Sequence, residues 1–105
     1  MRKLLLEHEG YRVLTAAGEG VAAGLLQREA VDLVLLDYSV ADAGRVAGSI
    51  RQIRSALPIV LISFSASFPT ALNNLIDGWV SKTRNPDVLL RRIEQLLGKK
   101  QGRDI

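Results

Sequence analysis

Asp32-Leu33-Val34-Leu35-Leu36-Asp37 is a continuous apolar run held between two aspartates. Such a run is typical of a strand covered on both faces, as in a parallel sheet flanked by helices. Pro58-Ile59-Val60-Leu61-Ile62-Ser63 is a second run of this kind, with its proline at the first position, where a missing N–H is tolerated. Trp79-Val80-Ser81-Lys82 is a shorter third strand. The three runs predict the buried centre of one domain.

Helical patterns stand between and after these strands. Their apolar residues recur every three or four positions, which places them on one face of a helix. The final helix has Asn85 as its cap and Gly98 as its stop. The predicted helices cover residues 18–29, 43–57, 69–76 and 85–97.

The first residues add one further helix and strand. Leu4, Leu5 and Leu6 before Gly10 indicate the last turns of a helix that ends at a glycine with positive φ. Residues 11–15 carry β-forming side chains and predict a short strand. Strands and helices thus alternate along the chain, which predicts an α/β fold, a doubly wound parallel sheet with helices on both faces.

Composition narrows the classes of function. The 105 residues make one domain, 48% apolar, with no cysteine and one histidine, which excludes disulfides, thiolate metal sites and a cysteine nucleophile. A net charge of +3 is too small to indicate nucleic acid, and no apolar run approaches the length of a membrane span. We expect a cytoplasmic protein that binds neither nucleic acid nor membrane, with a domain over residues 1–98 and a frayed polar tail over 99–105.

Polar side chains end the three predicted strands. In an open parallel sheet, ligands bind beyond the carboxyl ends of the strands, so Asp37, Ser63 and Lys82 are the candidate site residues. Strands lie about 4.8 Å apart, so the backbones of Asp37 and Lys82 would be roughly 10 Å apart, a gap that a lysine side chain spans. A carboxylate, a hydroxyl and an ammonium would then meet, as a phosphoryl acceptor with two donors requires.

These strands, in this order and spacing, resemble the receiver domain of two-component response regulators. The resemblance implies that Asp37 is the phosphoacceptor, that Ser63 and Lys82 bind the phosphoryl group, and that Trp79 is an aromatic switch. It also implies a flavodoxin-like fold. Each residue has a plain structural interpretation as well: Asp37 and Ser63 in turns, Lys82 in solvent and Trp79 in the core.

The chain departs from this family at its start. Receivers open with a strand that ends in two acidic residues, and we expect a sheet of about four strands that lacks this first strand. The resemblance would leave Mg²⁺ with only the Asp37 carboxylate and the Ser39 carbonyl, a weak site. Two arrangements stay open: the strand at residues 11–15 pairs with the Leu33 strand, or another chain fills the slot between them.

The leading hypothesis is a stand-alone, degenerate receiver, not an enzyme, that acts mainly through protein contacts with weak or no phosphorylation of Asp37. Its expected partners are a histidine kinase or another signalling protein, and a second copy in a homodimer. One alternative is a working phospho-switch at Asp37 whose metal ligands come from a partner chain. A second alternative is a small anion-binding α/β protein outside signalling.

Overall fold

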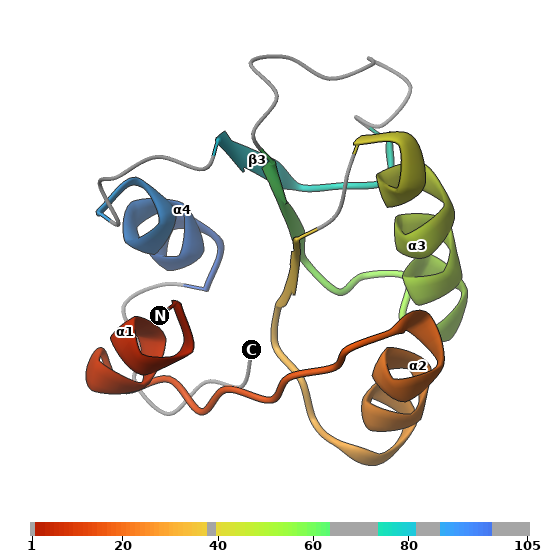
Figure 1. Cartoon of the computed structure of the whole chain (residues 1–105), viewed down its shortest axis with the longest axis horizontal. Helices are drawn as coiled ribbons and strands as arrows, with labels where there is room; N and C mark the ends of the chain where they lie inside the picture. Colours follow the sequence, from red (N-terminus) through yellow and green to blue (C-terminus); the bar gives the residue numbers. More distant parts are fainter. Residues whose placement is uncertain (1, 38–39, 64–73, 82–86, 98–105) are drawn as a thin grey trace.

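Three parallel strands form the centre of the computed structural model, which describes residues 2–37, 40–63, 74–81 and 87–97. The strand order is β1-β2-β3, with β1 at Val34–Leu36, β2 at Ile59–Ser63 and β3 at Gly78–Ser81. The four helices are α1 (Arg2–His8), α2 (Glu19–Arg28), α3 (Val40–Ile53) and α4 (Asp87–Leu97). Helices α1 and α4 cover one face of the sheet, and α2 and α3 cover the other (Figure 1). The predicted layered α/β architecture is confirmed.

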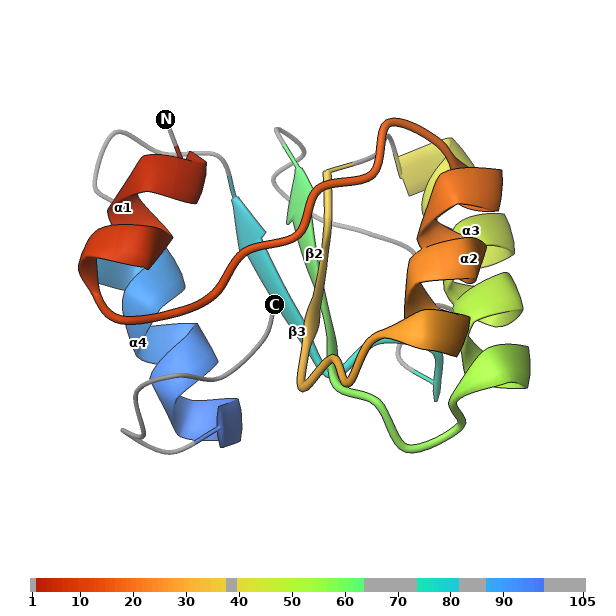
Figure 2. The ribbon, with the colours of Figure 1, turned by 90° about the horizontal axis from the view of Figure 1, so that it is seen from below.

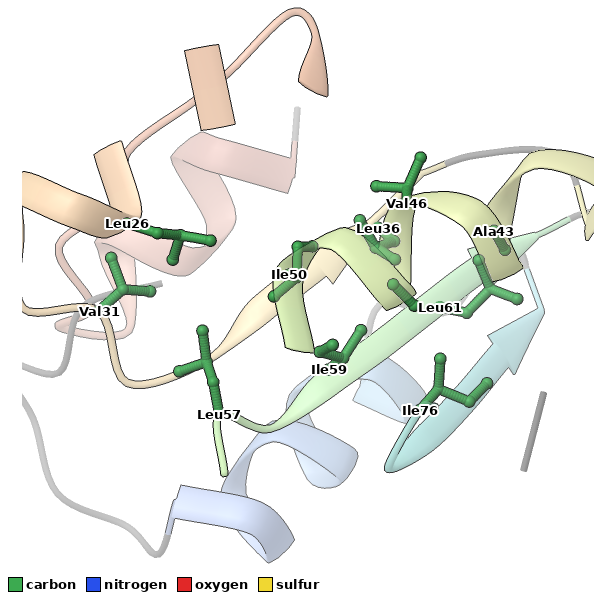
Figure 3. Packing of buried hydrophobic residues seen from close by; sticks show 11 residues of the cluster. Leu26, Val31, Leu36, Ala43, Val46, Ile50, Leu57, Ile59, Leu61 and Ile76 are labelled. Atoms are coloured by element: carbon green, nitrogen blue, oxygen red, sulfur yellow. The ribbon is translucent and has the colours of Figure 1, made fainter. Parts of the chain in front are cut away.

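The central strand β2 explains why the chain folds in layers. Its side chains alternate between two apolar clusters, with Ile59 and Leu61 in the α2/α3 cluster and Val60 and Ile62 in the α1/α4 cluster. None of the four is more than 3% exposed, as expected for a strand covered on both faces. Figure 3 shows the α2/α3 cluster, where Val46 and Ile50 of α3 face Leu36, Ile59 and Leu61 of the sheet.

Helix α1 ends as the sequence predicts. Gly10 has φ 96°, and the Tyr11 N–H donates to the Leu6 carbonyl at 3.1 Å while the Gly10 N–H donates to the Glu7 carbonyl at 3.1 Å. This pattern closes a helix when a glycine adopts the left-handed conformation. A residue with a Cβ would be strained there.

Within residues 11–15 only Arg12 has bridge-type backbone pairing, so the predicted strand is wrong, and the sheet has three strands in the described ranges instead of about four. The segment instead crosses the open edge of the sheet from one helical layer to the other (Figure 2). Val13 packs against the α1/α4 cluster and Leu14 against the α2/α3 cluster, while exposed Arg12 pairs with Glu29 at 2.9 Å. A cavity lies between this segment and β1, so their backbones do not form a ladder.

The other predicted elements vary in outcome. The patterns at residues 18–29, 43–57 and 85–97 correspond to α2, α3 and α4, with shifted ends. Most of the helix predicted at residues 69–76, and the tail at 99–105, lie outside the described residues.

Candidate functional site

The strands finish at one edge of the sheet. Both pairs are parallel, with Leu36 opposite Leu61 and Ser63 opposite Ser81. Asp37 directly follows the last residue of β1. The strand register therefore places Asp37 beside the last two residues of β2. The carboxyl ends of β1, β2 and β3 thus meet, as the topology of a parallel sheet requires.

Asp37 is the described acidic side chain at this edge. It is exposed, and it also lines the cavity beside β1. An exposed carboxylate at the carboxyl end of a central parallel sheet is accessible to a phosphoryl donor or to a partner protein. Of the other predicted residues, Ser63 ends β2, but its side chain lies outside the described part, as do Ser39 and Lys82 entirely. The convergence of the three side chains therefore stays a prediction.

Trp79 lies in β3, opposite Leu61 of β2. Its ring is half-buried and packs against the α2/α3 cluster. This position agrees with the plain interpretation of Trp79 as a core residue. Its proposed role as a switch stays a prediction.

Metal ligands are sparse in the described ranges. Those ranges contain no group of three or more His, Cys, Asp or Glu side chains that could hold an ion. Magnesium needs near-octahedral oxygen ligation, usually with one or two carboxylates, and Asp37 is the only predicted ligand whose side chain is described. The described residues therefore supply one of the two predicted magnesium ligands, and no chemical step below depends on the metal.

The described part contains a cavity of about 530 Å³ between β1 and the crossing segment. We call it the edge cavity. Its lining is mainly apolar and draws on both clusters, for example Leu6 and Ile62 from one and Leu26 and Val46 from the other. Lys3 and Asp37 supply charged groups to its wall. The sequence could not show this cavity, whose shape depends on how far apart β1 and the crossing segment lie.

Arg51 in the last turn of α3 and Arg54 just after that helix bind backbone carbonyls of neighbouring segments. Arg51 donates to the Leu75 carbonyl at 3.1 Å and to Asp77 Oδ2 at 2.7 Å, and the same carboxylate accepts the Ile59 N–H at 2.7 Å. Arg54 donates to the carbonyls of Leu26 and Glu29, both at 2.7 Å. The sequence places both arginines on a polar helix face, but the structure makes them anchors for neighbouring loops.

Comparison with known proteins agrees with this fold. The transcriptional regulatory proteins GlrR of Escherichia coli K12 and QseF of E. coli O157:H7 are each 28% identical to the chain over 99 residues, or 90% of it. The chain spans only 22% of the length of either protein. No protein-family model matches the chain.

A solved structure gives the same result for the fold. The chemotaxis protein CheY4 of Vibrio cholerae matches with a TM-score of 0.75 at 24% identity, over 90% of this chain and 88% of that one. The sequence similarity and the shared fold confirm the predicted resemblance to a receiver domain of response regulators. The chain is similar in sequence to GlrR and QseF and has the fold of CheY4.

Proposed function

We propose that the chain is a receiver module of two-component signalling that acts mainly through protein contacts, with weak or no phosphorylation of Asp37. The observation that carries this proposal is the position of Asp37, exposed at the strand ends where no acidic cluster accompanies it in the described ranges. Phosphoryl transfer to a carboxylate depends mostly on positioning and on neutralising charge. Asp37 provides the acceptor carboxylate of this reaction.

The remaining site roles belong to this proposal. Ser63 and Lys82 would donate hydrogen bonds to the oxygens of a phosphoryl group on Asp37, and Trp79 would respond to occupancy of the site. Ser39 would offer a backbone carbonyl to a weakly held Mg²⁺. A carboxylate, a hydroxyl and an ammonium at one edge form an anion site even when transfer is slow.

The partners follow from the fold class. A receiver fold is typically a signalling module without enzymatic activity of its own, so its output passes through another protein. We infer that this other protein is a histidine kinase or another signalling protein, and that the contact takes place in the cytoplasm. Residues 1–98 would form the interacting domain. None of the helices in the described ranges is both long and apolar enough to cross a membrane.

Chemical phosphorylation tests the proposal. The protein is incubated with acetyl phosphate and Mg²⁺, and the fraction carrying one added phosphoryl group is measured by intact mass spectrometry. We expect a minor labelled fraction or none. Asp87→Ala, which removes the first-turn aspartate of α4, is the matched control for Asp37→Ala.

The same experiment separates the two alternatives. Near-complete labelling that Asp37→Ala abolishes and Asp87→Ala preserves would contradict weak phosphorylation and favour the switch. A change in tryptophan fluorescence when beryllium fluoride binds would also favour the phospho-switch. Because Trp79 is the only tryptophan, this signal would come from Trp79. Binding of inorganic phosphate that is independent of Mg²⁺ and of any kinase would favour the anion-binding protein.

A further inference from the structure

Helix α2 is weak by its own sequence. Its ten residues, Glu19–Arg28, include Gly20 and Gly24, and a glycine inside a helix lowers its stability relative to alanine. The N-cap residue, Gly18, makes no side-chain hydrogen bond to the helix. An isolated helix of this length is marginal in water even when it is rich in alanine. Contacts with other elements must therefore keep α2 folded.

The first turn of α2 is bound to α3 through Glu19. The Glu19 carboxylate accepts a hydrogen bond from the Ser49 hydroxyl at 2.6 Å and pairs with the Arg45 guanidinium. Arg45 and Ser49 are four residues apart on α3, so they share one face of that helix and meet the carboxylate together. We call these three residues the first-turn latch.

The last turn of α2 is bound to the residue that directly follows α3. The Arg54 guanidinium donates to the carbonyls of Leu26 and Glu29, both at 2.7 Å. The last four carbonyls of a helix have no partner within that helix, and the Leu26 carbonyl is one of them. Arg54 supplies this donor from outside and places a cation at the negative end of the helix dipole. We call Arg54 and the two carbonyls the last-turn latch.

Both latches join α2 to α3 or to its end. The two helices lie side by side in both views of the ribbon (Figure 1 and Figure 2). Residues 9–18 before α2 and residues 29–33 after it contain neither helix nor strand. The strand pairs of the sheet involve residues 34–36, 59–63 and 78–81. Helix α2 can therefore leave α3 without breaking a strand pair.

We propose that α2 opens and closes on α3 as one unit, with the two latches holding it closed while the sheet, α3 and α4 stay folded. Proteins open locally in contiguous units, and such an opening costs less free energy than global unfolding. The open state would expose Leu26, which is buried in the α2/α3 cluster. A ligand or partner that binds the open state more tightly would shift the population toward it. This opening does not depend on the proposed function or on phosphorylation of Asp37.

Native-state hydrogen exchange of the intact chain tests the proposal. Amide exchange is followed by mass spectrometry at low concentrations of urea, on peptides that cover α2 and β2. The dependence of an opening on urea scales with the surface that the opening exposes. We expect the amides of α2 to be protected at least about tenfold less than those of β2, and their exchange to depend less on urea. This measurement needs no variant.

A change on the opposite face of the sheet separates local from global opening. Ile93 of α4 packs in the α1/α4 cluster, so Ile93→Val weakens contacts that survive when α2 alone opens. The substitution is expected to speed the exchange of β2 about two- to tenfold and to leave the exchange of α2 unchanged. Because it removes a single methylene group, the variant is expected to stay folded.

Two arginine variants test the last-turn latch. Arg54→Met keeps an unbranched side chain but removes the donor to the Leu26 and Glu29 carbonyls, and it is expected to speed the exchange of α2 at least about tenfold. Arg28→Met is the matched control, because Arg28 is an exposed arginine on α2 itself. Its α2 exchange is expected to stay within about twofold of the wild type.

Three results would overturn the proposal. They are equal protection and equal urea dependence of α2 and β2, equal acceleration of both by Ile93→Val, and unchanged exchange of α2 in Arg54→Met. The first two would mean that α2 opens only when the whole domain unfolds. The third would mean that the last-turn latch does not hold the helix closed.

Discussion

Arg51 connects three parts of the fold through one guanidinium group. It donates to the carbonyls of Ser55 at 3.0 Å and of Leu75 at 3.1 Å, and it pairs with Asp77, while its own side chain is only 19% exposed. A buried carbonyl that loses its donor costs more than the net value of one hydrogen bond. The ion pair between Arg51 and Asp77 therefore contributes to the stability of the fold.

Arg51→Ala is expected to lower the free energy of unfolding by about 2 kcal/mol, because several acceptors lose their donor together. Urea denaturation measures the change. Arg12→Ala removes an ion pair whose side chains are 54% and 34% exposed, and it is expected to cost less than about 1 kcal/mol. Equal losses in the two variants would contradict the anchoring role of Arg51.

Glu19 introduces a dependence of stability on pH. A hydrogen bond from the Ser49 hydroxyl at 2.6 Å, and then the Arg45 guanidinium, lower the pKa of its carboxyl. A carboxyl whose pKa is lower in the folded state stabilises the fold when ionised, so its contribution is present above the unfolded pKa and is lost as pH falls.

The wild type is therefore expected to lose part of its stability below about pH 4.5, and Glu19→Gln is expected to lose less over the same range. Thermal unfolding of both proteins across pH 3 to 6, at constant ionic strength of about 0.1 M, measures the difference. Parallel pH profiles for the two would show that the Glu19 contacts do not contribute.

Residue types alone could identify Asp37 as a candidate, because it ends an apolar run at the functional edge of a parallel sheet. They could not identify Arg51 or Arg54 as anchors. On a helix, an arginine on the polar face has the same pattern whether it faces solvent or a neighbouring carbonyl, and only the loops packed beside α3 distinguish the two.

Helix α4 shows how an amphipathic element attaches to the sheet. Ile93 is fully buried in the α1/α4 cluster, and Val88, five residues earlier on the same helix, is 39% exposed. Ile93→Ala is expected to cost about 2 to 5 kcal/mol through lost transfer free energy and the cavity it leaves. Val88→Ala is expected to change stability by less than about 0.5 kcal/mol.

Urea unfolding of these two variants tests the packing of α4. A loss near zero for Ile93→Ala would mean that α4 does not pack on this face in solution. Chevron or two-probe measurements are needed only if the unfolding curves of the variants differ in slope, which would signal a change in the unfolded state.

Elements with strong patterns were predictable, and the weak strand was not. Continuous apolar runs identify β1 and β2 because both faces are buried, and a repeat of three to four residues identifies α2, α3 and α4. Residues 11–15 have strand-like composition, but a strand also needs a neighbour within hydrogen-bonding reach. The edge cavity separates residues 11–15 from β1. This separation depends on tertiary packing, so no local sequence pattern predicts it.

No strand in the described ranges pairs with the outer side of β1, which borders the edge cavity. Strand edges and apolar cavities promote association when nothing covers them. The chain is therefore expected to form a homodimer at high concentration through this edge. Size-exclusion chromatography with light scattering measures the mass of the protein in solution.

A clean monomer at high concentration would contradict self-association. The Ala22→Phe variant, compared with Val21→Phe, provides a second check, since filling the cavity should weaken the dimer while the solvent-facing change should not.

The central claim is that Asp37 and Lys82 meet at one end of the sheet, and cross-linking tests it most directly. Because the chain has no cysteine, the double variant Asp37→Cys with Lys82→Cys takes a bismaleimide linker at those positions alone. Two strand spacings place the backbones roughly 10 Å apart, so a linker of about that span should bridge them. The control is Asp32→Cys with Lys82→Cys, since Asp32 precedes β1 at the opposite end.

Intact mass spectrometry of the monomer gives the result. We predict one bridging linker in the Asp37 pair and two singly attached linkers in the Asp32 pair. Two singly attached linkers in the Asp37 pair would contradict the claim and, with it, the candidate site.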